Sequence, residues 1–352
     1  MKMKNIIKKQ QKTIFIGFMS VALFIICICT VCTAYAADKD NAKTPVDIPG
    51  LTYDHSMELS YAEEFSVDYY NDGYALITID QEGQFLVVPE GKKAPKGLEK
   101  DITVIQQPLN NIYLVATSAM DLFRAIDGID SIRLSGTQEN GWYIQEAKDA
   151  MESGKMIYAG KYNAPDYELI LDEGCGLAIE STMIHHNPEV EEKLEQFGIP
   201  VMVERSSYES HPLGRTEWMK LYAVLLGKED VAEKAFKEQT DKLDKVLTSD
   251  DKDTGKTVAF FYINSTGAVN VRKNGDYVSN MIELAGGNYS LNGYLPEEDS
   301  ALSTMKMQME DFYVAEKDAD ILIYNGTIEG ELTSVDELIA KNSLFADFKA
   351  VK

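Results

Sequence analysis

The sequence is poor in cysteine, and its four cysteines are unevenly placed. Cys27, Cys29 and Cys32 lie within the first 36 residues, so Cys175 is the only cysteine in the body of the chain. That body can therefore form no intramolecular disulfide bond. Cys175 stands in EGCGLAIE without a basic neighbour, which favours a packed thiol over a reactive one.

Basic residues are scarce as well. The chain has 34 lysines and arginines against 57 aspartates and glutamates, which gives a net charge of −23 at pH 7. A surface this acidic repels nucleic acid and anionic lipid, so we predict that the protein binds neither. An anionic ligand would need a local basic pocket.

The first 36 residues differ from the rest. A head with five lysines precedes an uncharged apolar run at 14–31, and Ala34-Tyr35-Ala36 fits a signal-peptide cleavage pattern. We predict a signal peptide or an N-terminal membrane anchor, with lipid attachment as a third option. The remaining chain is then extracytoplasmic, either secreted or tethered to the outer face of a bacterial cytoplasmic membrane, and this segment is its only membrane contact.

The pattern of apolar residues predicts an α/β fold. Between residues 46 and 98, runs such as YALITI and QFLVVPEG predict strands and turns. From Thr103 onward, strands alternate with helices: NIYLVA precedes SAMDLFRAI, and LAIES precedes PEVEEKLEQFG. This alternation predicts a parallel sheet with helices on its faces. Pro165 and Pro188 are predicted to open two helices, because the first helical turn does not need the missing N–H.

A long helical stripe divides the chain into two parts. Residues 229–247 carry apolar residues at helical spacing and predict a helix of about 28 Å. The alternation then restarts with TVAFFYIN, YVSNMIELAGG and DILIYNG. We predict two α/β lobes with mainly parallel sheets: an N-terminal lobe at 37–227, an inter-lobe helix at 228–250 and a C-terminal lobe at 251–352.

The stretch IESTMIHHNPEV holds two of the four histidines. It follows an apolar strand, so it lies at the carboxyl end of a parallel strand, where open α/β sheets bind ligands. Three interpretations stay open: a surface or packing role, contact with a larger ligand, or a metal site. The metal site would combine His185 or His186 with His211 and Glu180. Because no pair has close metal-ligand spacing, we predict that the protein itself holds no metal.

The next loop, SSYESHPLGR, occupies the same kind of place after the strand IPVMVE. It offers Tyr208, His211 and Arg215, and Arg205 stands just before it. Two further glutamates, Glu168 and Glu310, each lie in a helix that leads to a strand, one in each predicted lobe.

Several segments resemble one family in order and spacing. NAPDYELILDEGCGLAIEST, LEQFGIPVMVE, GRTEWMKLYAVLLGKEDVAEKAF, YVSNMIELAGGN and MEDFYVAEKDADILIYNG are similar to successive segments of the class III, helical-backbone substrate-binding proteins. The similarity covers about residues 100–350. This family delivers ferric siderophores, haem, cobalamin or metal ions to ABC importers.

The resemblance implies a ligand cleft between two lobes that a rigid helix bridges. It also implies that Glu168 and Glu310 pair with arginines of the permease, one acid on each lobe. The chain departs from the family in its poor lipobox and in stopping at FADFKAVK, where members continue into a strand and a helix. We therefore expect a truncated C-terminal lobe.

We predict a binding protein without catalysis, which captures an iron complex of the ferric-siderophore type. Its expected partners are the chelate and an ABC permease, and it needs no cofactor, since iron arrives within the chelate. Alternatives are a haem or cobalamin receptor, a direct zinc or manganese receptor, and an exported hydrolase with a histidine base. The predicted ligand-binding residues are Thr117, Ser118, Trp142, His185, His186, Arg205, Tyr208, His211, Arg215 and Arg272, because arginines and aromatic rings suit an anionic chelate.

Overall fold

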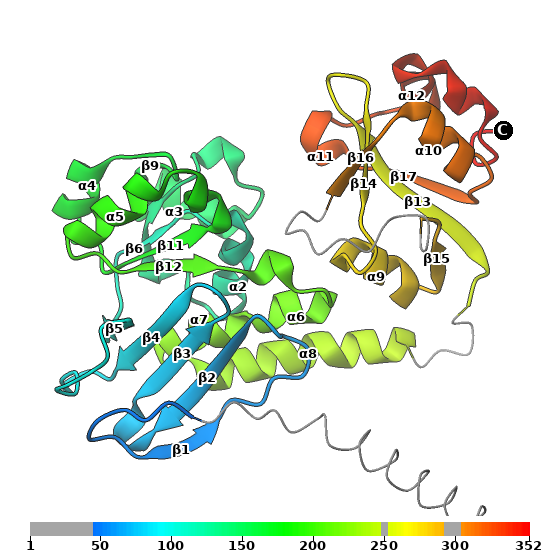
Figure 1. Ribbon diagram of the computed structural model, residues 1–352. Coiled ribbons are helices and arrows are strands. Elements are labelled where there is room, and N and C mark those ends of the chain that lie inside the picture. The colour runs from blue at the N-terminus through cyan, green and yellow to red at the C-terminus, as the bar shows by residue number, and fades with distance from the viewer. Residues whose placement is uncertain (1–44, 248–252, 292–303) are drawn as a thin grey trace, which may run out of the picture. The chain divides into compact units, whose positions relative to one another are not determined.

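The computed structural model describes residues 45–247, 253–291 and 304–352 (Figure 1). The predicted signal peptide or anchor at 1–36 lies outside these residues. Among the residues described, no helix is both long enough and apolar enough to cross a membrane.

The N-terminal region forms a five-stranded sheet of its own, blue to cyan in Figure 1. Its strands are β1 (Tyr53–Ser56), β2 (Phe65–Tyr70), β3 (Ala75–Ile79), β4 (Gly83–Val88) and β5 (Ile102–Gln106). Neighbours from β1 to β4 are antiparallel, and β5 pairs with β4 in parallel. Thr103 therefore lies in the last strand of this sheet. The predicted change of pattern at Thr103 was wrong by one strand.

A parallel sheet follows, as predicted from the alternation. Its order is β12-β11-β6-β7-β8, and every pair in it is parallel. The strands are β6 (Ile112–Leu114), β7 (Ile132–Ser135), β8 (Ile157–Tyr158), β11 (Leu177–Ser181) and β12 (Val201–Glu204), and the helices between them are α2 (Met120–Ala125), α3 (Gln145–Glu152), α4 (Tyr167–Asp172) and α5 (Pro188–Gln196). Alternate residues of β11 enter different apolar clusters: Ile179 packs with the cluster of α2, and Ala178 with that of α5. The sheet is thus buried on both faces.

The two prolines behave differently. Pro188 is the first residue of α5, as predicted. Pro165 lies in β10 (Ala164–Pro165), which pairs with β9 (Gly160–Lys161), and α4 begins two residues later. Asp166 caps α4, because its carboxylate accepts a hydrogen bond from the backbone N–H of Leu169 at 3.1 Å.

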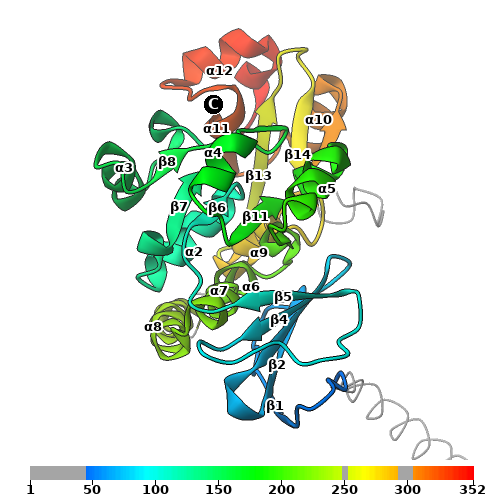
Figure 2. The same cartoon turned by 90° about the vertical axis from the view of Figure 1, so that its left-hand side faces the viewer.

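Three helices follow β12: α6 (Pro212–Glu217), α7 (Met219–Leu226) and α8 (Glu229–Leu247). Every residue of α7 from Met219 to Leu225 is buried. Gly227 ends α7 in the left-handed conformation, with φ of 65°, which glycine adopts without strain. The predicted helix at 229–247 is present as α8 and lies beside α7 (Figures 1 and 2).

Two buried carboxylates, one in α6 and one in the loop before it, hold residues 60–64. Glu217 accepts hydrogen bonds from the backbone N–H groups of Ser60, Tyr61 and Ala62 at 2.8–3.0 Å. Its side chain is fully buried and pairs with Lys220 at 3.1 Å. The segment before β2 is therefore fixed from a distant part of the chain.

Glu209 holds the next two residues in the same way. It accepts hydrogen bonds from the backbone N–H groups of Glu63 and Glu64 and from Trp218 Nε1. Gly214 makes this close approach possible, because a Cβ there would lie 2.9 Å from the carbonyl oxygen of Tyr61.

The C-terminal part has its own sheet and core. β13 (Lys256–Ile263) pairs in parallel with β15 and β17 and antiparallel with β14, which pairs antiparallel with β16. The other elements are β14 (Val269–Arg272), α9 (Tyr277–Leu284), β15 (Gly287–Tyr289), β16 (Thr304–Met307), α10 (Met309–Glu316), β17 (Ile321–Tyr324), α11 (Gly326–Glu329) and α12 (Val335–Lys341). Phe261, Phe312, Phe345 and Phe348 pack against one another in its centre. The last residues described are thus part of this core.

Candidate functional site

Three turns gather at the carboxyl edge of the parallel sheet. They are η2 (Thr117–Ala119) after β6, η5 (Thr182–His186) after β11 and η6 (Ser206–Tyr208) after β12. Together they carry half of the predicted ligand-binding residues, namely Thr117, Ser118, His185, His186 and Tyr208. This is the edge at which open α/β sheets bind ligands.

Glu204 joins two of these turns. Ser118 Oγ donates a hydrogen bond to Glu204 Oε1, and the backbone N–H of Ser206 donates to Glu204 Oε2 at 2.8 Å. Glu204 is 2% exposed, and it ends the apolar strand β12. We had not predicted a role for it, although an acid at the end of an apolar strand was the available signal. The hydroxyl of Ser118, a predicted ligand contact, therefore already donates its hydrogen bond to a buried carboxylate.

Arg205 is not free to bind an anion. Its Nε donates to Glu64 at 2.6 Å and its Nη1 to Glu82 at 3.3 Å, and the side chain is only 9% exposed. Its guanidinium lies 4.2 Å from the ring centre of Tyr208, whose hydroxyl donates to Thr182 Oγ1 at 3.3 Å. The prediction of Arg205 as a ligand contact is not supported, because two carboxylates already compensate its charge.

The histidines are dispersed. His185 Nε2 lies 3.3 Å from Glu82 Oε1, and both His185 and His186 are exposed. His211 stacks on Tyr61, with ring centres 4.4 Å apart, and its Nδ1 accepts a hydrogen bond from the backbone N–H of Leu213. Burial lowers the pKa of His211. The structure gives His211 a role as the cap of α6.

Glu180 also has surroundings that do not suit a metal. It is 0% exposed, and neither carboxylate oxygen has a hydrogen-bond partner within the described part of the chain. Burial, with a smaller contribution from Glu191, raises its pKa to about 8. In residues 45–247, 253–291 and 304–352, no three histidine, cysteine, aspartate or glutamate side chains lie together as a metal site would require. The metal set of Glu180, His211 and one loop histidine is not assembled.

Trp142, a predicted ligand contact, is buried, whereas its neighbour Tyr143 is exposed. Trp142 is 5% exposed, packs in the main core and donates from Nε1 to Ser135 Oγ at 3.2 Å. Tyr143, its neighbour, is 99% exposed. It stands in the loop after β7, at the same edge of the sheet. The predicted ligand contact by Trp142 is not supported, and sequence reasoning missed the exposed ring.

Arg215 and Arg272 meet at one aromatic ring. The guanidinium of Arg215 lies 3.9 Å from the ring centre of Tyr277, and that of Arg272 lies 5.6 Å from it. Arg272 also pairs with Asp276 at 3.6 Å, and Asp276 caps α9 through the backbone N–H of Val278. Arg215 makes no ion pair with any residue that the structure describes. The two arginines thus lie at one ring, with Asp276 compensating part of the charge of Arg272.

Asn280 strengthens this contact. Its amide nitrogen donates to the backbone carbonyl of Ser210 at 2.7 Å, which joins α9 to the loop before α6. The positive charges of Arg272 and Arg215 also affect Asp276, the cap of α9. Burial raises the pKa of the Asp276 carboxyl, and the two arginines lower it.

Glu168 and Glu310 are both exposed, each in the first turn of its helix, α4 and α10. Neither carboxylate forms an ion pair within the described residues, so both are available to a partner.

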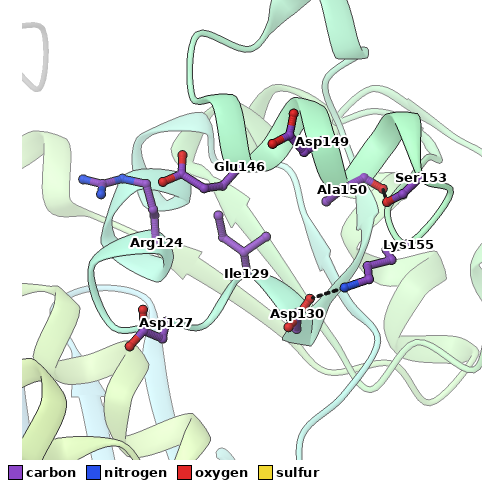
Figure 3. Close-up of a pocket in the computed structure, with 9 residues that line it drawn as sticks. All are labelled: Arg124, Asp127, Ile129, Asp130, Glu146, Asp149, Ala150, Ser153 and Lys155. Atoms are coloured by element: carbon purple, nitrogen blue, oxygen red, sulfur yellow. Dashed lines mark hydrogen bonds and ion pairs between the residues drawn. The ribbon is translucent and has the colours of Figure 1, made fainter.

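A separate hollow of about 650 Å³ lies at the opposite edge of the sheet, before β7 and β8 (Figure 3). Asp127, Asp130, Glu146 and Asp149 line it, with Arg124 and Lys155. Lys155 pairs with Asp130 at 3.4 Å. Because its lining is mainly acidic and lies away from the three turns, we assign it no ligand.

Several solved structures share this fold. The periplasmic haem-binding protein HutB of Vibrio cholerae matches with a TM-score of 0.53 and 17% identity, over 69% of this chain and 86% of that one. The periplasmic catecholate-siderophore binding protein VctP of Vibrio cholerae matches with a TM-score of 0.52 and 12% identity, over 70% and 83%. A possible iron-binding periplasmic solute-binding protein of Staphylococcus epidermidis gives 0.51 and 17%, over 68% and 85%. The chain has the fold of the class III substrate-binding proteins. The class III fold predicted from the sequence segments is thereby confirmed.

Two relatives align along most of the chain. One uncharacterised lipoprotein of Methanocaldococcus jannaschii is 23% identical over 95% of this chain and 85% of its own length. A second from the same organism is 24% identical over 92% and 84%. No protein-family model matches the sequence. In this chain the three turns lie at the carboxyl edge of the parallel sheet.

Proposed function

We propose that this protein is the extracytoplasmic substrate-binding protein of an ABC importer, and that it captures an iron chelate of the ferric-siderophore type. The observation that supports the proposal most directly is the pair Arg215 and Arg272 at Tyr277, on a class III fold. Two guanidinium groups can pair with anionic donor groups of a chelate, and the ring can pack on its planar part. The protein then needs no catalytic group and no cofactor of its own.

The N-terminal segment would tether the protein to the outer face of the membrane. The two Methanocaldococcus relatives are lipoproteins by name, and the three solved proteins compared above are periplasmic by title. Haem is the second candidate ligand, because HutB is a haem-binding protein. Cobalamin and bare zinc or manganese ions remain the other ligands to be tested.

Ligand-induced stabilisation tests the proposal. A ferric tris-catecholate chelate at 100 times its dissociation constant should stabilise the wild-type protein by about 2.7 kcal/mol, and bare zinc or manganese should not. Replacing both Arg215 and Arg272 by alanine should weaken chelate binding at least about tenfold, since the anion then loses its charged partners. Melting temperature and calorimetry measure the two effects.

Arg124→Ala is the matched control, because Arg124 is exposed and pairs with Asp121 at the opposite edge of the sheet. Stabilisation by haemin alone would transfer the proposal to haem. Stabilisation by bare ions alone would contradict an iron-chelate receptor.

Docking to the permease gives a second prediction. Changing both Glu168 and Glu310 to alanine should abolish chelate uptake by cells while leaving chelate affinity within about twofold, because exposed rim charges steer docking and do not touch the ligand. Radiolabelled iron uptake and calorimetry would be compared. Asp172→Ala with Asp311→Ala, two exposed acids on the same helices, provides the control. Normal uptake by the Glu168 and Glu310 variant would refute the docking role.

A further inference from the structure

A single carboxylate of the N-terminal sheet contacts two turns of the candidate site. Glu82 lies between β3 and β4, and its side chain is 6% exposed. Its Oε1 lies 3.3 Å from Arg205 Nη1 and 3.3 Å from His185 Nε2. His185 belongs to η5, and Arg205 immediately precedes η6. One atom thus connects both turns to a different sheet.

Glu64 completes the restraint on Arg205. It accepts from Nε at 2.6 Å, while Glu82 accepts from Nη1, so two sides of one planar guanidinium are held. A planar donor group with two separate acceptors has little rotational freedom left. The ring of Tyr208 packs on this guanidinium, with its centre 4.2 Å from Arg205 Cζ.

Tyr208 carries the restraint back to η5 through its hydrogen bond to Thr182. The turn η5 is therefore held at both ends, by Thr182 at its first residue and by His185 near its last. The turn η6 is held by Tyr208 and by the buried Glu204. None of these contacts uses Arg215 or Arg272, the two arginines proposed to bind the chelate.

We infer that Glu82 and Glu64 are positioning residues for the ligand-facing turns η5 and η6, and that they act through Arg205 and His185. Glu82 and Glu64 do not touch the ligand; they set the geometry that the ligand meets. The consequence for ligand affinity rests on the proposed function, whereas the restraint itself can be measured on the ligand-free protein.

Hydrogen–deuterium exchange of the ligand-free protein tests the inference. Glu82→Gln should speed exchange about tenfold or more in peptides covering 182–187 and 205–211, where amide N–H groups of Asn187, Tyr208 and Glu209 are hydrogen-bonded within the turns. Peptides of β11 and β12 should be unchanged. Glu63→Gln is the matched control, since Glu63 is the exposed neighbour of Glu64.

Two further variants separate positioning from a general loss of stability. His185→Ala removes only the exposed contact, so it should speed exchange in 182–187 and leave 205–211 unchanged. The double variant of Glu82→Gln with Arg205→Gln should exchange no faster in 205–211 than Arg205→Gln alone, because both act through one contact. Faster chelate dissociation in Glu82→Gln, with Arg215 and Arg272 intact, would be the functional counterpart.

Unchanged exchange in both Glu82→Gln and His185→Ala would overturn the inference, whatever the ligand. Equal acceleration throughout the N-terminal lobe would also overturn it, because that result indicates global destabilisation. Failure of the wild-type protein to bind any chelate would count against the proposed function alone, and the exchange result would still decide the positioning role.

Discussion

Replacing Glu217 by alanine is expected to lower the free energy of unfolding by about 3–5 kcal/mol, the usual result of removing one partner of a buried ion pair. Among the residues that the structure describes, Lys220, 7% exposed, would keep only Glu233 as a charged partner. Three backbone N–H groups, those of Ser60, Tyr61 and Ala62, would lose their acceptor in a partly buried place. Urea denaturation followed by fluorescence measures the change.

Glu233→Ala is the control for this prediction. Glu233 pairs with the same lysine at the same distance of 3.1 Å, but its side chain is 68% exposed. Exposed ion pairs contribute at most about 1 kcal/mol, so this variant should stay close to the wild type. Equal destabilisation by the two substitutions would show that the amide contacts of Glu217 contribute little.

The second large effect concerns Glu180 and pH. Its pKa is about 8 in the folded protein, against 4.5 for the ordinary carboxyl, because burial disfavours the charged form. Below the unfolded pKa both states are protonated, and the contribution of Glu180 to stability is fully present. As pH rises toward 8, the unfolded chain ionises while the folded one does not, so this contribution is lost. The loss reaches on the order of 5 kcal/mol.

Glu180→Gln should remove this dependence, since the amide does not titrate. Relative to the wild type, the variant is expected to gain stability steadily between pH 5 and 8 and to show no further change above that range. Urea midpoints at pH 5, 6, 7, 8 and 9 test this. Glu316, whose pKa burial raises to about 7, is present in both proteins and cancels in the difference. Parallel pH profiles for the two proteins would mean that Glu180 ionises normally.

The sequence predicted much of the architecture because its main signals are local. Apolar runs and helical stripes depend on residues a few positions apart, so the parallel strands and α8 were found. The sheet to which 102–106 belongs was missed, since a short apolar run does not show which strand it will pair with. The predicted start of a helix at Pro165 was wrong, because Pro165 belongs to β10 and Asp166, one residue later, caps α4.

The candidate site was predicted less well, because burial and pairing depend on distant residues. Arg205 pairs with Glu64 and Glu82, which stand 141 and 123 positions earlier in the chain. Nothing near it in the sequence indicates that its charge is compensated. The adjacent rings Trp142 and Tyr143 differ in exposure only through the packing of the loop after β7. Arg215 and Arg272 were predicted from residue type alone, since an arginine suits an anionic ligand. Their meeting at Tyr277, which joins α6, β14 and α9, was not foreseen.

The attachment of residues 60–62 to Glu217 has a consequence for synthesis. The donors leave the ribosome 155–157 residues before their acceptor. Until the ribosome has passed Lys220, the nascent N-terminal strands have no docking surface on α6 and α7. Pairings this distant in sequence form late, after loop closure has been overcome. We therefore expect nascent chains ending before residue 209 to be cleaved readily by protease near 60–64, and chains extended past α7 to resist cleavage there.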